Sequence, residues 1–168
     1  MLFAFYLAAA VALVATALVV TRKNAVHALL YLVVSFLAVA VIFLLLGAPF
    51  VAALEVIVYA GAIMVLFLFV IMMLAVGEED AARERAWLSG GAWRGPTLLT
   101  LILAGELVWI VLGGGGPSLS GGQVEPRQVA LALFGPYVIG VELAGMLLLA
   151  GLVGAYHLGR PPESREHS

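Results

Sequence analysis

In this chain of 168 residues, 64% of the side chains are hydrophobic and 11% are charged, whereas about 25% are charged in a typical water-soluble domain. The composition therefore excludes an ordinary soluble domain, and the lack of cysteine excludes a disulfide framework, an Fe–S site and a thiol nucleophile within the chain. The formal net charge of −2 decides little, because in a membrane protein the placement of charges matters more than their sum.

Five apolar segments predict an all-α, polytopic membrane protein with five transmembrane helices. Their length and continuous apolar character favour helices over the strands of a barrel. The first segment is expected to span the membrane and not to be a signal peptide, because no basic residue precedes Arg22. We expect one membrane domain over residues 1–158 and a polar tail over 159–168. The predicted spans are about 2–20, 26–46, 51–76, 97–112 and 136–158.

The connections refine this picture. Gly47-Ala48-Pro49 predicts a tight, uncharged turn that makes the second and third spans a hairpin. The third segment, about 26 residues long, exceeds the hydrocarbon thickness and must tilt, kink or bulge. The glycine run at 113–116 begins a loop through Pro126 that we expect to be irregular and mobile.

The distribution of Lys and Arg predicts the orientation. With five spans, seven of the eight basic residues fall on one side, which the positive-inside rule assigns to the cytoplasm. The N-terminus is then outside and the C-terminus cytoplasmic, with residues 22–24, 77–96 and 160–168 inside and residues 47–50 and 113–135 outside. The seven are Arg22, Lys23, Arg83, Arg85, Arg94, Arg160 and Arg165, against Arg127 alone.

Three carboxyl groups, of Glu55, Glu106 and Glu142, lie within predicted spans, where no Lys or Arg can pair with them. An acidic side chain at the bilayer centre costs roughly 2.5–3.5 kcal/mol. Desolvation disfavours the charged form, so proton uptake near neutral pH becomes accessible. Each could equally be a protonated acid that only hydrogen-bonds between helices. Three of them on three helices favour a polar axis through the bundle.

The third span holds the strongest candidates for function. Glu55 and Tyr59 are four residues apart and therefore share a helix face. Tyr59 lies deep in the span, either as a packing aromatic or as a functional hydroxyl, and Gly61 allows close helix approach or a distorted turn. No phosphate-binding loop, haem-ligating histidine pair, catalytic triad or metal cluster is visible, so we expect no cofactor in this chain.

The stretch Glu55-Val-Ile-Val-Tyr59-Ala-Gly61-Ala-Ile-Met64, with the apolar run to residue 74, resembles the third-helix signature of a known family. This family is subunit J of proton-pumping NADH–quinone oxidoreductase, respiratory complex I, whose mitochondrial counterpart is the ND-type chain six. Residues 24–29 and 137–151 are similar to the start of its second helix and to its final helix. The resemblance covers residues 1–158.

The resemblance implies a membrane-arm subunit that couples quinone reduction to proton translocation. It would be a non-catalytic subunit of the translocase and carry no redox centre. It implies a π-bulge near Tyr59–Val65 that forms and disappears, and a proton path or gate at Glu55, Tyr59, Gly61 and Glu142, with a weaker assignment for Glu106.

The resemblance also implies partners and location. NAD, FMN, Fe–S clusters and quinone would be bound by other subunits. The neighbours would be the quinone-chamber subunit, small three-helix subunits and antiporter-like subunits in a bacterial cell (inner) membrane, with no nucleic acid. Two alternatives stay open: the equivalent subunit of an Mrp-type cation/proton antiporter or membrane-bound hydrogenase, and a purely structural helix bundle.

Overall fold

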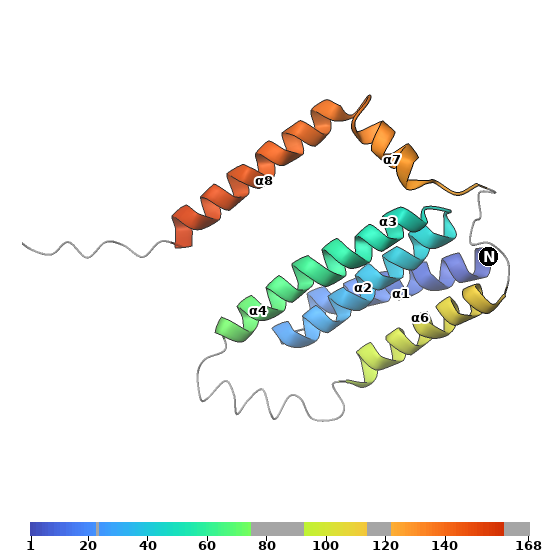
Figure 1. The fold of residues 1–168 in the computed structure, drawn as a ribbon. Coiled ribbons are helices and arrows are strands. Elements are labelled where there is room, and N and C mark those ends of the chain that lie inside the picture. Colours follow the sequence, from blue (N-terminus) through green and yellow to red (C-terminus); the bar gives the residue numbers. More distant parts are fainter. Residues whose placement is uncertain (23, 75–92, 114–121, 160–168) are drawn as a thin grey trace, which may run out of the picture. The chain divides into compact units, whose positions relative to one another are not determined.

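The computed structural model describes residues 1–22, 24–74, 93–113 and 122–159, and within these ranges the regular structure is helical, with no β-strand (Figure 1). The chain divides into two compact units, residues 1–125 and residues 126–168, and each is described by itself.

As predicted, the described residues include five helices that are long and apolar enough to cross a membrane. The fourth begins at Arg94, three residues before the predicted start, and the third begins at Pro49, two residues early. The helices are α1 (Leu2–Thr21), α2 (Ala25–Leu45), the third span Pro49–Met73, α6 (Arg94–Leu112) and α8 (Val138–Gly159).

A short connection and one capping side chain set the α1–α2 hairpin. The side-chain oxygen of Asn24 accepts hydrogen bonds from the backbone N–H groups of Val26 (2.9 Å) and His27 (3.2 Å), so that α2 begins at Ala25. Buried residues at three- and four-residue intervals form one face of α1, and three of the four are alanine. Such small side chains let two helix backbones approach closely. They are Ala4, Ala8, Val11 and Ala15.

The predicted tight hairpin between the second and third spans is present, and its geometry explains its sequence. Gly47 has φ 82°, in the left-handed region that favours glycine. The N–H of Ala48 donates to the carbonyl of Phe43 (2.9 Å), and that of Gly47 to Leu44 (3.1 Å), which is the Schellman pattern. Pro49 then begins the next helix, where a missing N–H costs nothing.

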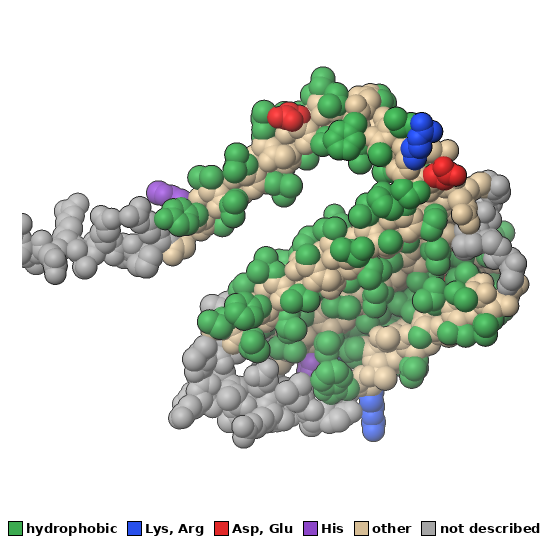
Figure 2. All heavy atoms as spheres, viewed as in Figure 1, with side chains coloured by type: hydrophobic (Ala, Val, Ile, Leu, Met, Phe, Trp, Pro, Cys, Tyr) green, Lys and Arg blue, Asp and Glu red, His purple; other side chains and the backbone are tan. Residues whose placement is uncertain are grey.

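The core of the first unit lies where α6 packs against α1 and α2. It consists of two clusters at successive levels, and α6 contributes Ile110 to the first and Leu103 to the second. Large apolar side chains also cover the outside of these helices (Figure 2), as expected for surfaces that meet lipid or other chains. The other members are Ala4, Ala8, Val41 and Leu45 in the first cluster, and Val11, Ala15, Val34 and Ala38 in the second.

The second unit contains α7 (Pro126–Leu133) and α8. No helix was predicted at α7, whose eight residues are amphipathic but shorter than the window over which helical periodicity is counted. No described residue of α8 is buried, and a Cβ on Gly140 or Gly151 would meet nothing within 4 Å. The small residues and the large apolar side chains of α8 are thus both exposed. The mobile loop and the polar tail expected from the sequence lie mostly outside the described residues.

Candidate functional site

The third span is not a regular α-helix. It consists of α3 (Pro49–Leu54), a π-helical segment η1 (Glu55–Ile63) and α4 (Met64–Leu74). The N–H of Met64 reaches the carbonyl of Tyr59, five residues back, which is the π-helical spacing. The expectation that this long segment would tilt, kink or bulge is therefore confirmed as a stretch of π-helix.

Three of the predicted site residues lie in this segment. Glu55 is its first residue, and Tyr59 and Gly61 follow within it. The Tyr59 ring packs against Phe36 of α2, with ring centroids 5.3 Å apart and ring planes at 53°. Tyr59 is still 45% exposed, so one face of its ring remains open to whatever surrounds the chain.

Gly61 occupies a narrow position in the π-helical backbone. A Cβ added there would lie 3.2 Å from the carbonyl oxygen of Val56, a contact tighter than nine in ten that real Cβ atoms make. Val56 is five residues earlier, which is the spacing of a π-helical turn. The missing side chain therefore leaves room for the distorted turn.

The carboxyl groups lie in three different surroundings. Glu55 is partly buried, and Glu106 is 5% exposed on α6, with neither carboxyl oxygen hydrogen-bonded. Glu142 is exposed on α8, in the other unit. Within the described residues of the first unit, the carboxyl group of Glu106 bonds to no other group, and the polar axis through all three stays a prediction.

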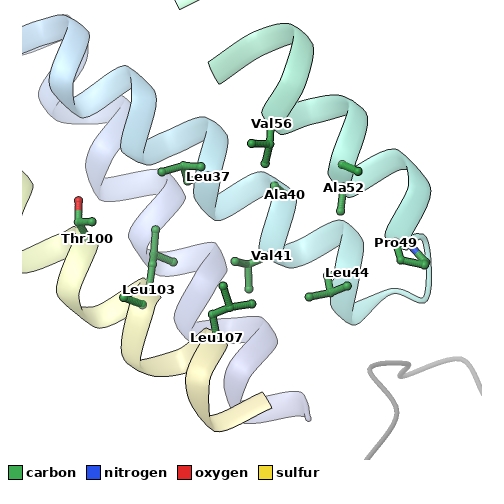
Figure 3. A pocket seen from close by; sticks show the side chains of 12 residues that line it. Leu37, Ala40, Val41, Leu44, Pro49, Ala52, Val56, Thr100, Leu103 and Leu107 are labelled. Atoms are coloured by element: carbon green, nitrogen blue, oxygen red, sulfur yellow. The ribbon is translucent and has the colours of Figure 1, made fainter. Parts of the chain in front are cut away.

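A groove of about 400 Å³ lies beside the start of the third span, where it is lined by α3 and by Val56 of η1 (Figure 3). Its floor is α2, and its two walls are the third span and α6. Among the lining side chains only Thr100 carries a polar group, and several of the others are alanines, whose small size leaves this space. The sequence did not predict this groove. Its lining is Leu37, Ala40, Val41, Leu44, Pro49, Ala52, Ala53, Val56, Thr100, Leu103, Ala104 and Leu107.

A second cluster, also not predicted, joins α1, α2 and α6 at the end where the basic residues lie. The Arg22 guanidinium donates to the Tyr31 hydroxyl (3.4 Å) and lies 5.3 Å from the centre of its ring, a cation–π arrangement. A Cβ on Gly95 of α6 would overlap this hydroxyl. The buried Nε2 of His27 has no hydrogen-bond partner in the described part of the chain.

The side chains that make up these sites are ionisable, hydroxyl-bearing or apolar. Among the described residues no group of three or more His, Asp or Glu side chains could hold a metal ion. The arrangement instead combines ionisable and hydroxyl side chains with a backbone that departs from α-helical register.

Comparison with known proteins places the chain in one family. A profile of NADH-ubiquinone/plastoquinone oxidoreductase chain 6 matches residues 15–158. NADH-quinone oxidoreductase subunit J of Pseudomonas aeruginosa is 54% identical over 159 residues, 94% of this chain and 96% of that protein. Subunit J of Escherichia coli (strain K12) is 50% identical over 164 residues, 98% of this chain and 89% of that protein. The subunit J of Rhodobacter capsulatus is 38% identical over 161 residues, 91% of this chain and 78% of that protein.

Proposed function

Because the chain belongs to the subunit J (chain 6) family of NADH-quinone oxidoreductases, we propose that it couples quinone reduction to proton translocation through its third span. The chain is a membrane subunit of that enzyme. The proposal adds that η1 exchanges between π-helical and α-helical register, and that this exchange makes and breaks a water path past Glu55 and Tyr59.

One observation carries the proposal: Glu55, Tyr59 and Gly61 fall together in a nine-residue π-helical segment. π-Helical turns within α-helices are frequently found at functional sites, where local backbone strain serves a function. Glu55 can hold a proton, and the Tyr59 hydroxyl can meet water in one register and not in the other. The absent side chain at Gly61 lets the turn form.

Two acidic residues outside the third span have lesser roles in this proposal. Glu142 would continue the proton path, and the assignment of Glu106 to the same path is weaker. The chain would act as a non-catalytic subunit, with NAD, FMN, Fe–S clusters and quinone bound by its partners. Those partners would be the quinone-chamber subunit, small three-helix subunits and antiporter-like subunits.

The remaining features of the proposal concern the membrane. The subunit would lie in the bacterial inner membrane with its N-terminus outside and its C-terminus in the cytoplasm, as the seven-to-one division of basic residues indicates. The names of the relatives favour this assignment over the related antiporter or hydrogenase. A purely structural helix bundle is the remaining competitor.

Replacing Tyr59 by Phe distinguishes the proposed gate from a purely structural helix bundle. The ring that packs on Phe36 is kept, and only the hydroxyl is lost. We expect Tyr59→Phe to lower proton flux in inverted membrane vesicles during NADH oxidation, with normal subunit content by immunoblot. The matched control is Tyr6→Phe, the same change at an exposed position on α1. If both variants pump protons at the parental rate, the gate is wrong and the structural function takes its place.

A further inference from the structure

Within the described part of the chain, Glu106 is a buried carboxyl group that the proposed gate does not need. Glu106 is 5% exposed, and both of its carboxyl oxygens lack a hydrogen-bond partner. It follows Leu103 by three residues and precedes Ile110 by four, so all three lie on one face of α6. Because those two neighbours belong to the two core clusters, Glu106 lies between the clusters, against α1 and α2.

The residues of α1 and α2 where the two clusters adjoin are apolar. α1 presents Ala8 and Val11 at this level, and α2 presents Ala38 and Val41. The nearest polar side chains in this interface, Thr16 of α1 and Ser35 of α2, bond to each other at 2.8 Å. A neutral carboxylic acid can be accommodated in such surroundings, whereas an unpaired carboxylate is strongly disfavoured.

The titratable groups of α1 and α2, and the basic groups next to them, do not pair with Glu106. Tyr6 of α1 is exposed, and Arg22 bonds to Tyr31 of α2. Tyr31 precedes Ala38 by seven residues, about 10 Å along the helix, and His27 lies a further turn away. Met1 lines a small pocket with Ile110 and Gly113, at the C-terminal end of α6. None of these groups pairs with the carboxyl group of Glu106.

We propose that Glu106 is a proton-binding site whose occupancy decides whether α6 stays packed against α1 and α2. The neutral acid allows the packed arrangement. Loss of the proton leaves a charge with no partner, and α6 then turns or moves away so that the carboxylate leaves the interface.

The groove next to α6 provides a destination for this movement. Leu103 belongs both to a core cluster and to the groove lining, so the face that carries Glu106 adjoins the groove. Thr100, one turn and a half earlier on α6, offers a hydroxyl there. Because the opposite wall of the groove is the third span, a proton taken up at Glu106 would change the space beside η1. This site is distinct from the gate in η1, and its test does not depend on that gate.

The test measures the contact between α1 and α6 directly, in membranes that contain the complete complex. The chain has no cysteine of its own, so the pair Ala8→Cys and Ile110→Cys reports disulfide formation between these helices, because both positions belong to one cluster. The control pair is Thr16→Cys with Ser35→Cys, which joins α1 to α2 without α6. Dividing the first yield by the second removes the intrinsic effect of pH on thiol oxidation.

We expect the corrected α1–α6 yield to fall severalfold between about pH 6 and about pH 9, and to become independent of pH in Glu106→Gln. Glu106→Leu, which fills the same apolar interface, should also abolish the dependence. A corrected parental yield that does not change with pH overturns the proposal, and so does a dependence that persists in either variant. The parental pair alone decides the outcome if neither variant assembles. Tyr59→Phe, which tests the gate, should leave the profile unchanged.

Discussion

Replacing Gly61 by Ala changes the third span by a single methyl group, at the position where the π-helical turn leaves least room. In the observed register the new Cβ would lie 3.2 Å from the carbonyl oxygen of Val56, so that carbonyl must shift by a few tenths of an ångström. In a regular α-helix the same residue would not face a carbonyl displaced by the π-helical turn. The substitution therefore disfavours one register of η1 relative to the other.

Two effects contribute to the change in free energy between the registers, and only one of them survives. Ala is a better helix former than Gly by about 1 kcal/mol, but both registers gain this, so it cancels from their difference. The close contact acts on the π-helical register alone and costs about 1 kcal/mol, the low end of the range for overpacking. That amount changes the ratio of the two registers by roughly a factor of five. Gly61→Val adds two further methyl groups and should shift the balance more.

Such a shift is large for a gate whose two states differ by only a few kcal/mol. We expect Gly61→Ala to lower proton pumping and quinone-linked NADH oxidation together, and Gly61→Val to lower both further. The assay is proton flux and NADH oxidation in inverted vesicles, with subunit content checked by immunoblot. Gly105→Ala on α6 is the control, because a Cβ there meets nothing within 4 Å. Normal assembly and parental rates in both Gly61 variants would refute the reasoning.

Three further predictions concern stability and topology. Gly95→Ala should lower the stability of the detergent-solubilised complex by about 1–3 kcal/mol, because the new Cβ would overlap the buried Tyr31 hydroxyl. Gly105→Ala is the control and should leave the stability unchanged. Equal melting curves for the two variants would contradict this prediction. Cysteines placed singly at Ser89 and Ser120, both outside the described residues, should label from opposite sides of the membrane, and labelling from one side refutes five spans. The chain expressed alone in detergent should aggregate, since α8 buries none of its described residues; a folded, cooperatively melting monomer would show otherwise.

Hydropathy alone predicts the five spans, because membrane helices are specified by length and continuous apolar character. The distortion of the third span is predicted by its excess length. The tight turn between α2 and α3 is predicted by its Gly-Ala-Pro sequence. The burial of Glu106 could not be predicted, since it depends on which face of α6 meets the small residues of α1. The groove likewise results from tertiary packing of three helices. α7 was missed because its eight residues, although amphipathic, are shorter than the window over which helical periodicity is counted.

The Schellman turn at Gly47 gives the third span one fixed end. Its two backbone hydrogen bonds and the following proline hold the start of α3 to the end of α2, while α4 has no such restraint among the described residues. Loss of the one extra residue that a π-helical turn accommodates rotates everything beyond it by about 100° and translates it by about 1.5 Å. With α3 held, that screw motion is transmitted in one direction only. A local change of register at η1 therefore presents a different set of α4 side chains to whatever surrounds them.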